Sequence, residues 1–169
     1  MASTTSLLAA AVIDSPVGAL TIAGNDDVLM HLSFGRDESV LGVSANMDAG
    51  AHPVLRHVAD ELDQYFAGTR RTFTVTVDPR GTQFQRAAWF ALLAAEFGRT
   101  MSYADQAAHI GKPTATRAVG AANGRNPVAI VLPCHRVVGK NGTLTGFAGG
   151  LDVKQWLLDH ERAVAARDK

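Results

Sequence analysis

One cysteine stands in the run Pro-Cys-His-Arg-Val at residues 133–137, next to side chains that can activate a thiol. The thiolate is the nucleophilic form of cysteine, and positive charge near the sulfur favours it over the thiol. We therefore expect His135 and Arg136 to lower the pKa of Cys134. Adjacent side chains of an extended segment point to opposite faces, so a water is expected to bridge His135 and Cys134.

A single cysteine also restricts the chemistry of the chain. It excludes an intramolecular disulfide and a zinc site made of several thiolates, and an inert buried cysteine is the main alternative to a reactive one. A histidine that acts as a base needs a carboxylate to orient it. Residues 106–151 contain no Asp or Glu, so this carboxylate must come from elsewhere, and the closing helix offers Glu161.

Charge is distributed unevenly, although the formal net charge of the 169 residues is zero. Residues 1–81 are acidic on balance, whereas the acid-free segment 106–151 carries only basic charges. These basic residues are Lys112, Arg117, Arg125, Arg136 and Lys140. Such a segment predicts a surface that faces phosphates, and a chance gap in a region of low charge is the alternative.

The first half of the chain has the alternation and turn signals of a small sheet with one helix. A helix is predicted over 54–66, ending at Gly68. The run Asp-Pro-Arg-Gly at 78–81 is typical of a linker and is predicted to separate two domains. Strands are predicted at 7–13, 19–23, 28–34 and 73–77, with a hairpin turn at 15–18 and a loop at 35–50.

The second half is predicted to be mostly helical. A β-branched apolar run at 128–132 predicts a buried strand-like segment leading to Cys134. Helices 103–109 and 116–124, joined by a tight turn, match the helix-turn-helix pattern, for which close packing of small residues is the alternative explanation. The predicted helices are 84–95, 103–109 and 116–124, with Thr82, Ser102 and Thr114 as their N-caps, and a closing helix from about 153.

These patterns predict an α+β protein with two domains. Residues 1–78 form a small antiparallel-sheet domain with one helix, and residues 82–169 form a mostly helical domain with the helix-turn-helix. Apolar residues make up 47% of the chain and charged residues 19%, enough for a packed core. No apolar run is long enough to span a membrane, and the run at 7–13 has no basic leader, so a cytoplasmic protein is expected.

Taken together, these motifs resemble the O6-alkylguanine-DNA alkyltransferase family over about residues 82–162. The family's hallmark, Pro-Cys-His-Arg-Val after an apolar run, matches at every position of 133–137. The first 80 residues are loosely compatible with the family's N-terminal domain. Further matches are Ser102-Tyr103, Arg117-Ala118-Val119-Gly120, Asn126-Pro127-Val128, Gly149-Gly150-Leu151, Trp156-Leu157-Leu158 and Glu161.

The resemblance implies a single-turnover methylated-DNA–protein-cysteine methyltransferase activity in DNA repair. Cys134 would accept an alkyl group from O6-alkylguanine, with O4-alkylthymine as a further candidate. His135 would act as a water-mediated base oriented by Glu161, and Asn126 would hold the backbone and the thiolate environment. Tyr103 would help to rotate the nucleotide out of the duplex and donate a proton or hydrogen bond to the leaving base.

The resemblance also implies how duplex DNA is held through its minor groove after the damaged base is flipped. Arg117 would fill the space that the flipped nucleotide leaves. Phe147 stands where many relatives carry Tyr, and Ala148 where some carry Ser, so the preferred alkyl group can differ. The further DNA contacts expected are Lys112, Thr114, Ala121 and Lys140. The substrate pocket is expected to contain Asn123, Val137, Phe147, Ala148 and Gly149.

No metal or cofactor is expected, because the thiolate itself receives the group. The partner expected is damaged double-stranded DNA, bound by a monomer that can cluster along it, without a membrane partner. Two other classes of function stay open at this point. One is a DNA-binding module that only marks lesions, which the cysteine at position 134 argues against. The other is a cysteine hydrolase, which would turn over many times.

Overall fold

A four-stranded sheet with one long helix against it forms the N-terminal part of the computed structural model, which describes residues 8–168. The strand order is β3-β2-β1-β4, with β1, β2 and β3 antiparallel and β4 parallel to β1. The predicted α+β class is therefore confirmed. The strands are β1 (Ala9–Ile13), β2 (Leu20–Gly24), β3 (Leu29–Phe34) and β4 (Ala45–Asn46).

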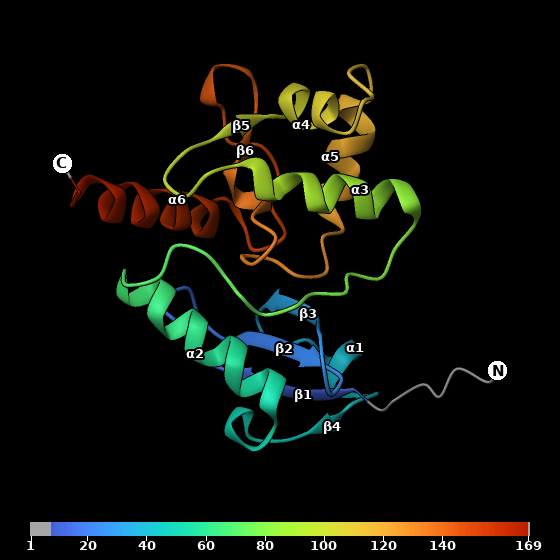
Figure 1. The fold of residues 1–169 in the computed structure, drawn as a ribbon, viewed down its shortest axis with the longest axis vertical. Coiled ribbons are helices and arrows are strands. Elements are labelled where there is room, and N and C mark those ends of the chain that lie inside the picture. The colour runs from blue at the N-terminus through green and yellow to red at the C-terminus, as the bar shows by residue number, and fades with distance from the viewer. Residues whose placement is uncertain (1–7, 169) are drawn as a thin grey trace.

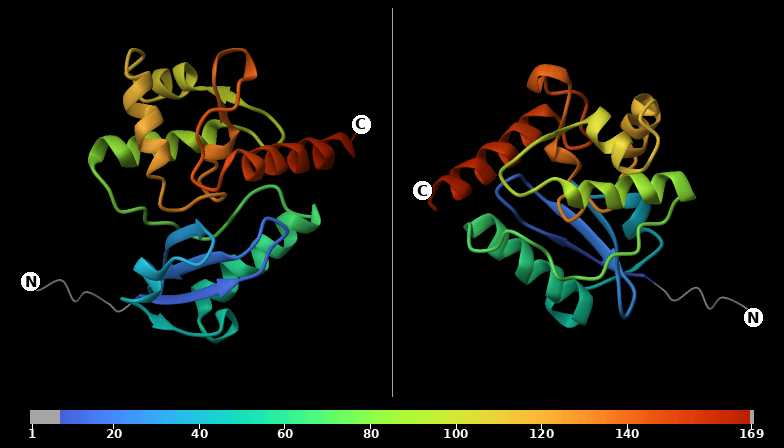
Figure 2. Two further views of the ribbon diagram at one scale, coloured as in Figure 1. Left: turned by 180° about the vertical axis from the view of Figure 1, so that it is seen from behind. Right: turned by 45° about the horizontal axis from the view of Figure 1, so that its top comes forward.

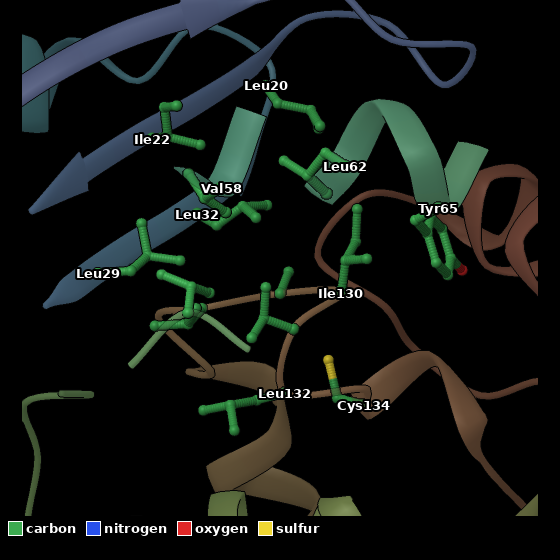
Figure 3. Close-up of a cluster of buried hydrophobic side chains, with 14 of the residues drawn as sticks. Leu20, Ile22, Leu29, Leu32, Val58, Leu62, Tyr65, Ile130, Leu132 and Cys134 are labelled. Carbon is green, nitrogen blue, oxygen red and sulfur yellow. The ribbon is translucent and has the colours of Figure 1, made fainter. Parts of the chain in front are cut away.

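The predicted helix 54–66 is observed as α2 (Pro53–Ala67), which packs against the sheet. Gly68 ends it at φ +80°, a left-handed conformation that suits glycine. Val58 and Leu62 are buried with Leu20 and Ile22 of the sheet in one apolar cluster (Figure 3). The three predicted strands before α2 are confirmed, with Leu7 of the first one outside the described residues.

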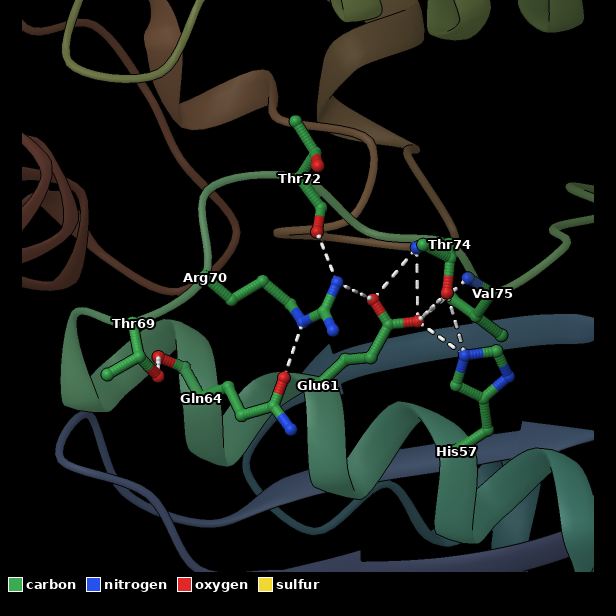
Figure 4. A network of polar contacts seen from close by, with 8 residues as sticks. All are labelled: His57, Glu61, Gln64, Thr69, Arg70, Thr72, Thr74 and Val75. Atoms are coloured by element: carbon green, nitrogen blue, oxygen red, sulfur yellow. Dashed lines mark hydrogen bonds and ion pairs between the residues drawn. The ribbon is translucent and has the colours of Figure 1, made fainter.

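Two predictions for the N-terminal part are wrong. The predicted loop 35–50 contains α1 (Glu38–Leu41), β4 and the 3₁₀ turn η1 (Ala49–Ala51). The predicted strand 73–77 is irregular, with a bend at Val75, and Val77 forms only an isolated bridge to Leu29. The backbone N–H groups of Thr74 and Val75 donate to the buried carboxylate of Glu61 (Figure 4), so they are not available to a sheet.

The C-terminal part is mostly helical, as predicted, and begins at α3. Thr82 and Ser102 cap α3 and α4 through their hydroxyl groups, which confirms both predicted caps. Within residues 8–168, no helix is long and apolar enough to cross a bilayer. The elements are α3 (Gln83–Ala91), η2 (Leu92–Ala94), β5 (Met101–Ser102), α4 (Tyr103–His109), α5 (Thr116–Gly124), η3 (Cys134–Arg136), β6 (Val137–Val138), η4 (Lys140–Gly142) and α6 (Leu151–Ala166).

Two local predictions for this part are also wrong. Thr114 does not cap α5, because Ala115 occupies the N-cap position and no side chain bonds there. The predicted strand-like run 128–132 is buried but turns sharply, with Ile130 at φ +68° and the N–H of Leu132 donating to Val128 O. This turn delivers Cys134 into the 3₁₀ turn η3 rather than into an extended chain.

The two parts share one apolar core. Figures 1 and 2 show the segment between α2 and α3 passing between them. The N–H of Leu32 in β3 donates to Pro127 O at 2.8 Å, and the N–H of Ala129 donates to Leu32 O at 3.0 Å. Ile130 and Cys134 then join the cluster that contains the sheet residues (Figure 3). The N-terminal sheet therefore holds the backbone just before the cysteine.

Candidate active site

His135, the residue after the cysteine, forms a buried pair with Glu161 of α6. His135 and Glu161 are both fully buried, and His135 Nε2 is 2.6 Å from Glu161 Oε2. A carboxylate only accepts hydrogen bonds, so Nε2 carries the ring proton and Nδ1 of the neutral ring keeps its lone pair. In the part of the chain that the structure describes, Nδ1 of His135 is buried and has no hydrogen-bond partner.

Arg136 belongs to the same cluster and does not face solvent. Its Nε lies 2.8 Å from Glu161 Oε1, and its Nη1 donates to Ala95 O at 2.8 Å. Burial alone would raise the pKa of Glu161, but hydrogen bonds and charge from His135 and Arg136 hold it well below its usual range. Arg136, one of the five basic residues of the acid-free segment, is therefore bound to Glu161 inside the protein and cannot contact a DNA phosphate.

Cys134 is 7% exposed and belongs to the buried core cluster. Burial raises its pKa, while hydrogen bonding from Asn126 and the positive charge of Lys154 act in the opposite direction. The prediction that His135 and Arg136 lower this pKa is wrong, because the His135 ring N–H and the Arg136 guanidinium are both turned to Glu161. Cys134 therefore rests as a thiol, and it needs a base to become nucleophilic.

Burial also determines the state of His135. It lowers the pKa of the imidazole, and the charges of Arg136 and Lys154 lower it further, while Glu161 partly offsets them. The ring is thus neutral near neutral pH and can take up a proton at Nδ1. A neutral histidine held by a carboxylate is the usual form of a general base.

Asn126 holds the turn that leads to the cysteine. Its Nδ2 donates to Leu132 O at 2.8 Å, and its Oδ1 accepts from the N–H of Val128 at 3.0 Å. Both ends of the amide are therefore used to close the buried turn. A shorter or apolar side chain would leave these backbone groups buried without partners.

Tyr103, at the start of α4, lies on an open hollow of about 350 Å³ beside α5. Its hydroxyl is 2.5 Å from Thr145 Oγ1, which joins α4 to the glycine-rich loop. Small residues of α5 border the hollow, so the tyrosine ring is accessible from that side. The lining residues are Tyr103, Thr116, Gly120, Gly124, Thr145 and Gly146.

The residues predicted to contact DNA through α5, the turn before it and η4 are all exposed. Arg117 and Ala121 are exposed on α5. Lys112 and Thr114 are exposed in the turn before it, and Lys140 is exposed at the start of η4. The four cations other than Arg136 in the acid-free segment are all exposed.

The predicted pocket residues are more dispersed. Phe147 and Gly149 are half-buried against Phe34 of β3, whose ring is 5.3 Å from that of Phe147, whereas Ala148 is exposed. Val137 is fully buried in β6, and Asn123 exchanges two amide hydrogen bonds of 2.8 Å with Gln106. The five predicted residues are thus not among those that line the hollow beside Tyr103.

Three residues that contact the predicted site residues or Lys154 were not predicted from the sequence. Lys154 is 1% exposed, and its Nζ donates to Thr145 O at 3.3 Å. Tyr65 of α2 donates its hydroxyl to Glu161 Oε2 at 2.6 Å. Thr145 stands in the glycine-rich loop, where the acid-free composition was the only hint. A lysine or tyrosine at helical spacing looks like any surface or core residue until the fold is known.

A buried thiol followed by a carboxylate-bound histidine is the arrangement of proteins that use cysteine as a nucleophile. Residues 8–79 match the family model for the ribonuclease-like domain of 6-O-methylguanine DNA methyltransferase, and residues 83–163 match its DNA binding domain. The chain belongs to this family, whose activity is DNA repair by alkyl transfer.

Individual relatives agree with this assignment. The methylated-DNA–protein-cysteine methyltransferase of Mycolicibacterium paratuberculosis is 48% identical over 153 residues, which covers 89% of this chain and 90% of the relative. The O6-methylguanine methyltransferase of Mycobacterium tuberculosis is similar in structure, with a TM-score of 0.84 at 42% identity over 93% of this chain and 94% of that one. Its OGT has also been solved in complex with DNA, with a TM-score of 0.81 at 42% identity over 92% and 94%.

Proposed function

We propose that this protein repairs O6-alkylguanine in duplex DNA by transferring the alkyl group to Sγ of its own Cys134. The observation that carries this proposal is the state of His135. His135 directly follows Cys134 in the same 3₁₀ turn. Its Nε2 is hydrogen-bonded to Glu161, while its buried Nδ1 has no hydrogen-bond partner within residues 8–168. The family membership supports the same chemistry.

The transfer is a direct displacement at a saturated carbon. The thiol proton of Cys134 passes through a bridging water to Nδ1 of His135, and Glu161 stabilises the imidazolium that forms. Sγ then forms a bond to the alkyl carbon while the bond from that carbon to O6 breaks. The electron pair stays with the base, and Tyr103 supplies a proton or hydrogen bond to it. The thioether that results is not readily hydrolysed, so each molecule acts once.

The substrate reaches Cys134 by base flipping through the minor groove, because a stacked base cannot be attacked in line. Arg117 enters the duplex and fills the space left by the nucleotide. Lys112, Thr114, Ala121 and Lys140 contact the backbone near it. The exposure of these five side chains, four of them on α5 or in the turn before it, supports this placement. Residues 103–124 act in this scheme as a helix-turn-helix.

The pocket for the damaged base lies between α5 and the glycine-rich loop. None of the five predicted pocket residues lines the hollow beside Tyr103. Phe147, Ala148 and Gly149, which directly follow Gly146 of the hollow, are proposed to shape the entrance for the base, and Asn123 and Val137 to support it. The small Ala148 leaves room for adducts larger than methyl, and O4-alkylthymine is a second substrate. No cofactor enters the reaction, because the cysteine itself is the acceptor.

The protein acts as a monomer that can cluster along DNA. Residues 82–169 carry the chemistry and the DNA contacts, and residues 1–78 support the turn before Cys134. The backbone hydrogen bonds that Leu32 makes with Pro127 and Ala129 support this assignment of roles to the two parts.

Mass spectrometry of the intact protein tests the proposal. After incubation with duplex DNA that contains O6-methylguanine, the chain is expected to gain one methylene unit, saturating at one per molecule and mapping to Cys134. Cys134→Ser is the control and should stay unmodified while it still binds DNA. A wild-type chain that binds the lesion without gaining mass would overturn the proposal in favour of lesion marking.

A further inference from the structure

Glu161 accepts more hydrogen bonds than its partnership with His135 requires. Oε2 accepts from His135 Nε2 at 2.6 Å, from Tyr65 at 2.6 Å and from Arg136 Nη2 at 3.2 Å. Oε1 accepts from Arg136 Nε at 2.8 Å and from the N–H of Gly98 at 3.3 Å. Tyr65 and His135 therefore share one oxygen of the carboxylate, at equal distances.

Tyr65 reaches this oxygen from the other part of the molecule. It lies in α2, 96 residues before Glu161, and its side chain is fully buried. Its ring packs against Phe73 and Phe97, with centroids at 5.6 and 6.1 Å, and against His160 at 5.3 Å. These contacts hold the phenol in one orientation, so the hydroxyl group has a defined direction.

The phenol is a donor and not a charged group. Burial, together with the charge of Glu161 and the hydrogen bond to it, raises the pKa of Tyr65 well above its usual value. A neutral hydroxyl beside a carboxylate must donate its proton, because Glu161 can only accept. The bond therefore withdraws negative charge from the oxygen that also orients His135.

We propose that Tyr65 is a positioning residue for alkyl transfer, through which α2 of the N-terminal part orients Glu161 and moderates the basicity of His135. The proposal rests on the proposed function and extends it. Within residues 8–168, the carboxylate partner of His135 is Glu161, and Glu161 is shared with a rigid hydroxyl of another element. The N-terminal part would then act directly on the proton relay, besides supporting the backbone before Cys134.

The direction of the effect follows from the charges around His135. The groups that face it are Cys134 and Arg136 of η3, Glu161 and Lys154 of α6, and, through Glu161, Tyr65 of α2. Without the hydroxyl of Tyr65, Glu161 Oε2 carries more negative charge and binds the protonated ring more strongly. The pKa of His135 must then rise. A base has to be neutral to accept a proton, so the acidic limb of the rate profile must move to higher pH.

Tyr65→Phe tests this inference because it removes one oxygen and keeps the ring packing. The single-turnover rate of transfer is measured at saturating methylated duplex across the pH range in which histidine titrates. The net contribution of one hydrogen bond, here the bond from Tyr65 to Glu161, predicts that the acidic limb of the rate profile moves to higher pH by about half a unit. Nuclear magnetic resonance of ¹⁵N-labelled histidine in the DNA-free protein should show the same upward shift for His135.

Val58→Ala is the matched control. It removes buried volume from the same core cluster, and neither valine nor alanine has a side-chain group that could hydrogen-bond in the relay. It should lower the melting temperature without moving the acidic limb or the His135 resonance. A folded Tyr65→Phe protein with an unshifted limb and an unshifted resonance overturns the inference, as does an equal shift in Val58→Ala. If the wild-type chain transfers no alkyl group, the proposed function fails instead, and the resonance still tests the link between Tyr65 and His135.

Discussion

Replacing Glu161 by Gln is the sharpest perturbation of the proposed relay, because it changes charge with little change in shape. Glu161 is fully buried and accepts from His135, Tyr65, Arg136 and Gly98. The glutamine keeps one oxygen, but its amide NH₂ must face donors at the other position. Either the bonds from His135 and Tyr65 at Oε2 or the bond from Arg136 Nε at Oε1 is therefore lost, and Arg136 keeps its buried charge without a carboxylate.

Two magnitudes follow for this variant. Breaking a buried ion pair from one side costs about 3–5 kcal/mol, and the glutamine oxygen recovers part of it, so we expect a loss of about 3 kcal/mol in the free energy of unfolding. The pKa of Glu161 is depressed in the folded protein, so its contribution to stability is present above the pKa of an unfolded glutamate and disappears as pH falls through the folded value. The stability difference between the wild type and Glu161→Gln should therefore shrink in acid.

The rate effect is separate from the stability effect. A positioned base contributes about 10²–10⁴-fold, and a His135 that has lost its orienting carboxylate keeps only part of this. We expect transfer at saturating DNA to slow by about 10²-fold, equivalent to about 3 kcal/mol of barrier. Rapid-quench assays should be run at a temperature where denaturant titration shows both proteins folded. An unchanged rate in a folded variant would refute the relay through Glu161.

Three further predictions follow from the site. Arg117→Ala should weaken capture of a duplex lesion by about tenfold or more, since truncating an important interface side chain costs more than about 1 kcal/mol, with less effect on reaction with the free modified base. Equal losses on both substrates would exclude an intercalating role. The rate of Cys134 alkylation by iodoacetamide should rise with pH to a midpoint above the pKa of an ordinary thiol. In Lys154→Met this midpoint should be higher still, because the lysine charge that lowers the pKa of the thiol is gone. A lower midpoint in the variant would contradict this. Phe34→Ala should loosen the loop at Phe147 and change the ratio of benzyl to methyl transfer rates several-fold, and an unchanged ratio would show that β3 does not shape the pocket.

Local chemistry made several elements predictable from sequence. The hydroxyls of Thr82 and Ser102 satisfy N–H groups three residues ahead, so both helix starts follow from a few neighbouring residues. Gly68 ends α2 because glycine tolerates the left-handed conformation found there. The motif around Cys134 belongs to the same category, because its residue types and order identify the chemistry before any coordinates are known.

Segments whose backbone partners come from far along the chain were mispredicted. The alternation at 73–77 is typical of a strand, but the carboxylate of Glu61 takes the N–H groups that a sheet would need. The apolar run at 128–132 is β-branched, but its register is set by Leu32 and by the amide of Asn126, which fold it into a turn. The β-propensity assigned to a segment depends on its own residues alone and does not include hydrogen-bond donors and acceptors from distant parts of the chain.

The sequence by itself determined the family, and it predicted Cys134 as the nucleophile with His135 and Glu161 as the pair behind it. Only the tertiary structure decided the protonation states of these groups and the identity of their other partners. Burial raises the pKa of Cys134, and Arg136 turns inward to Glu161, so positive neighbours in sequence are not positive neighbours of the sulfur. Tyr65 and Glu161 are 96 residues apart in the sequence and are hydrogen-bonded in the folded protein. Desolvation and hydrogen bonding depend on distances in space, which the spacing of residues along the chain does not reveal.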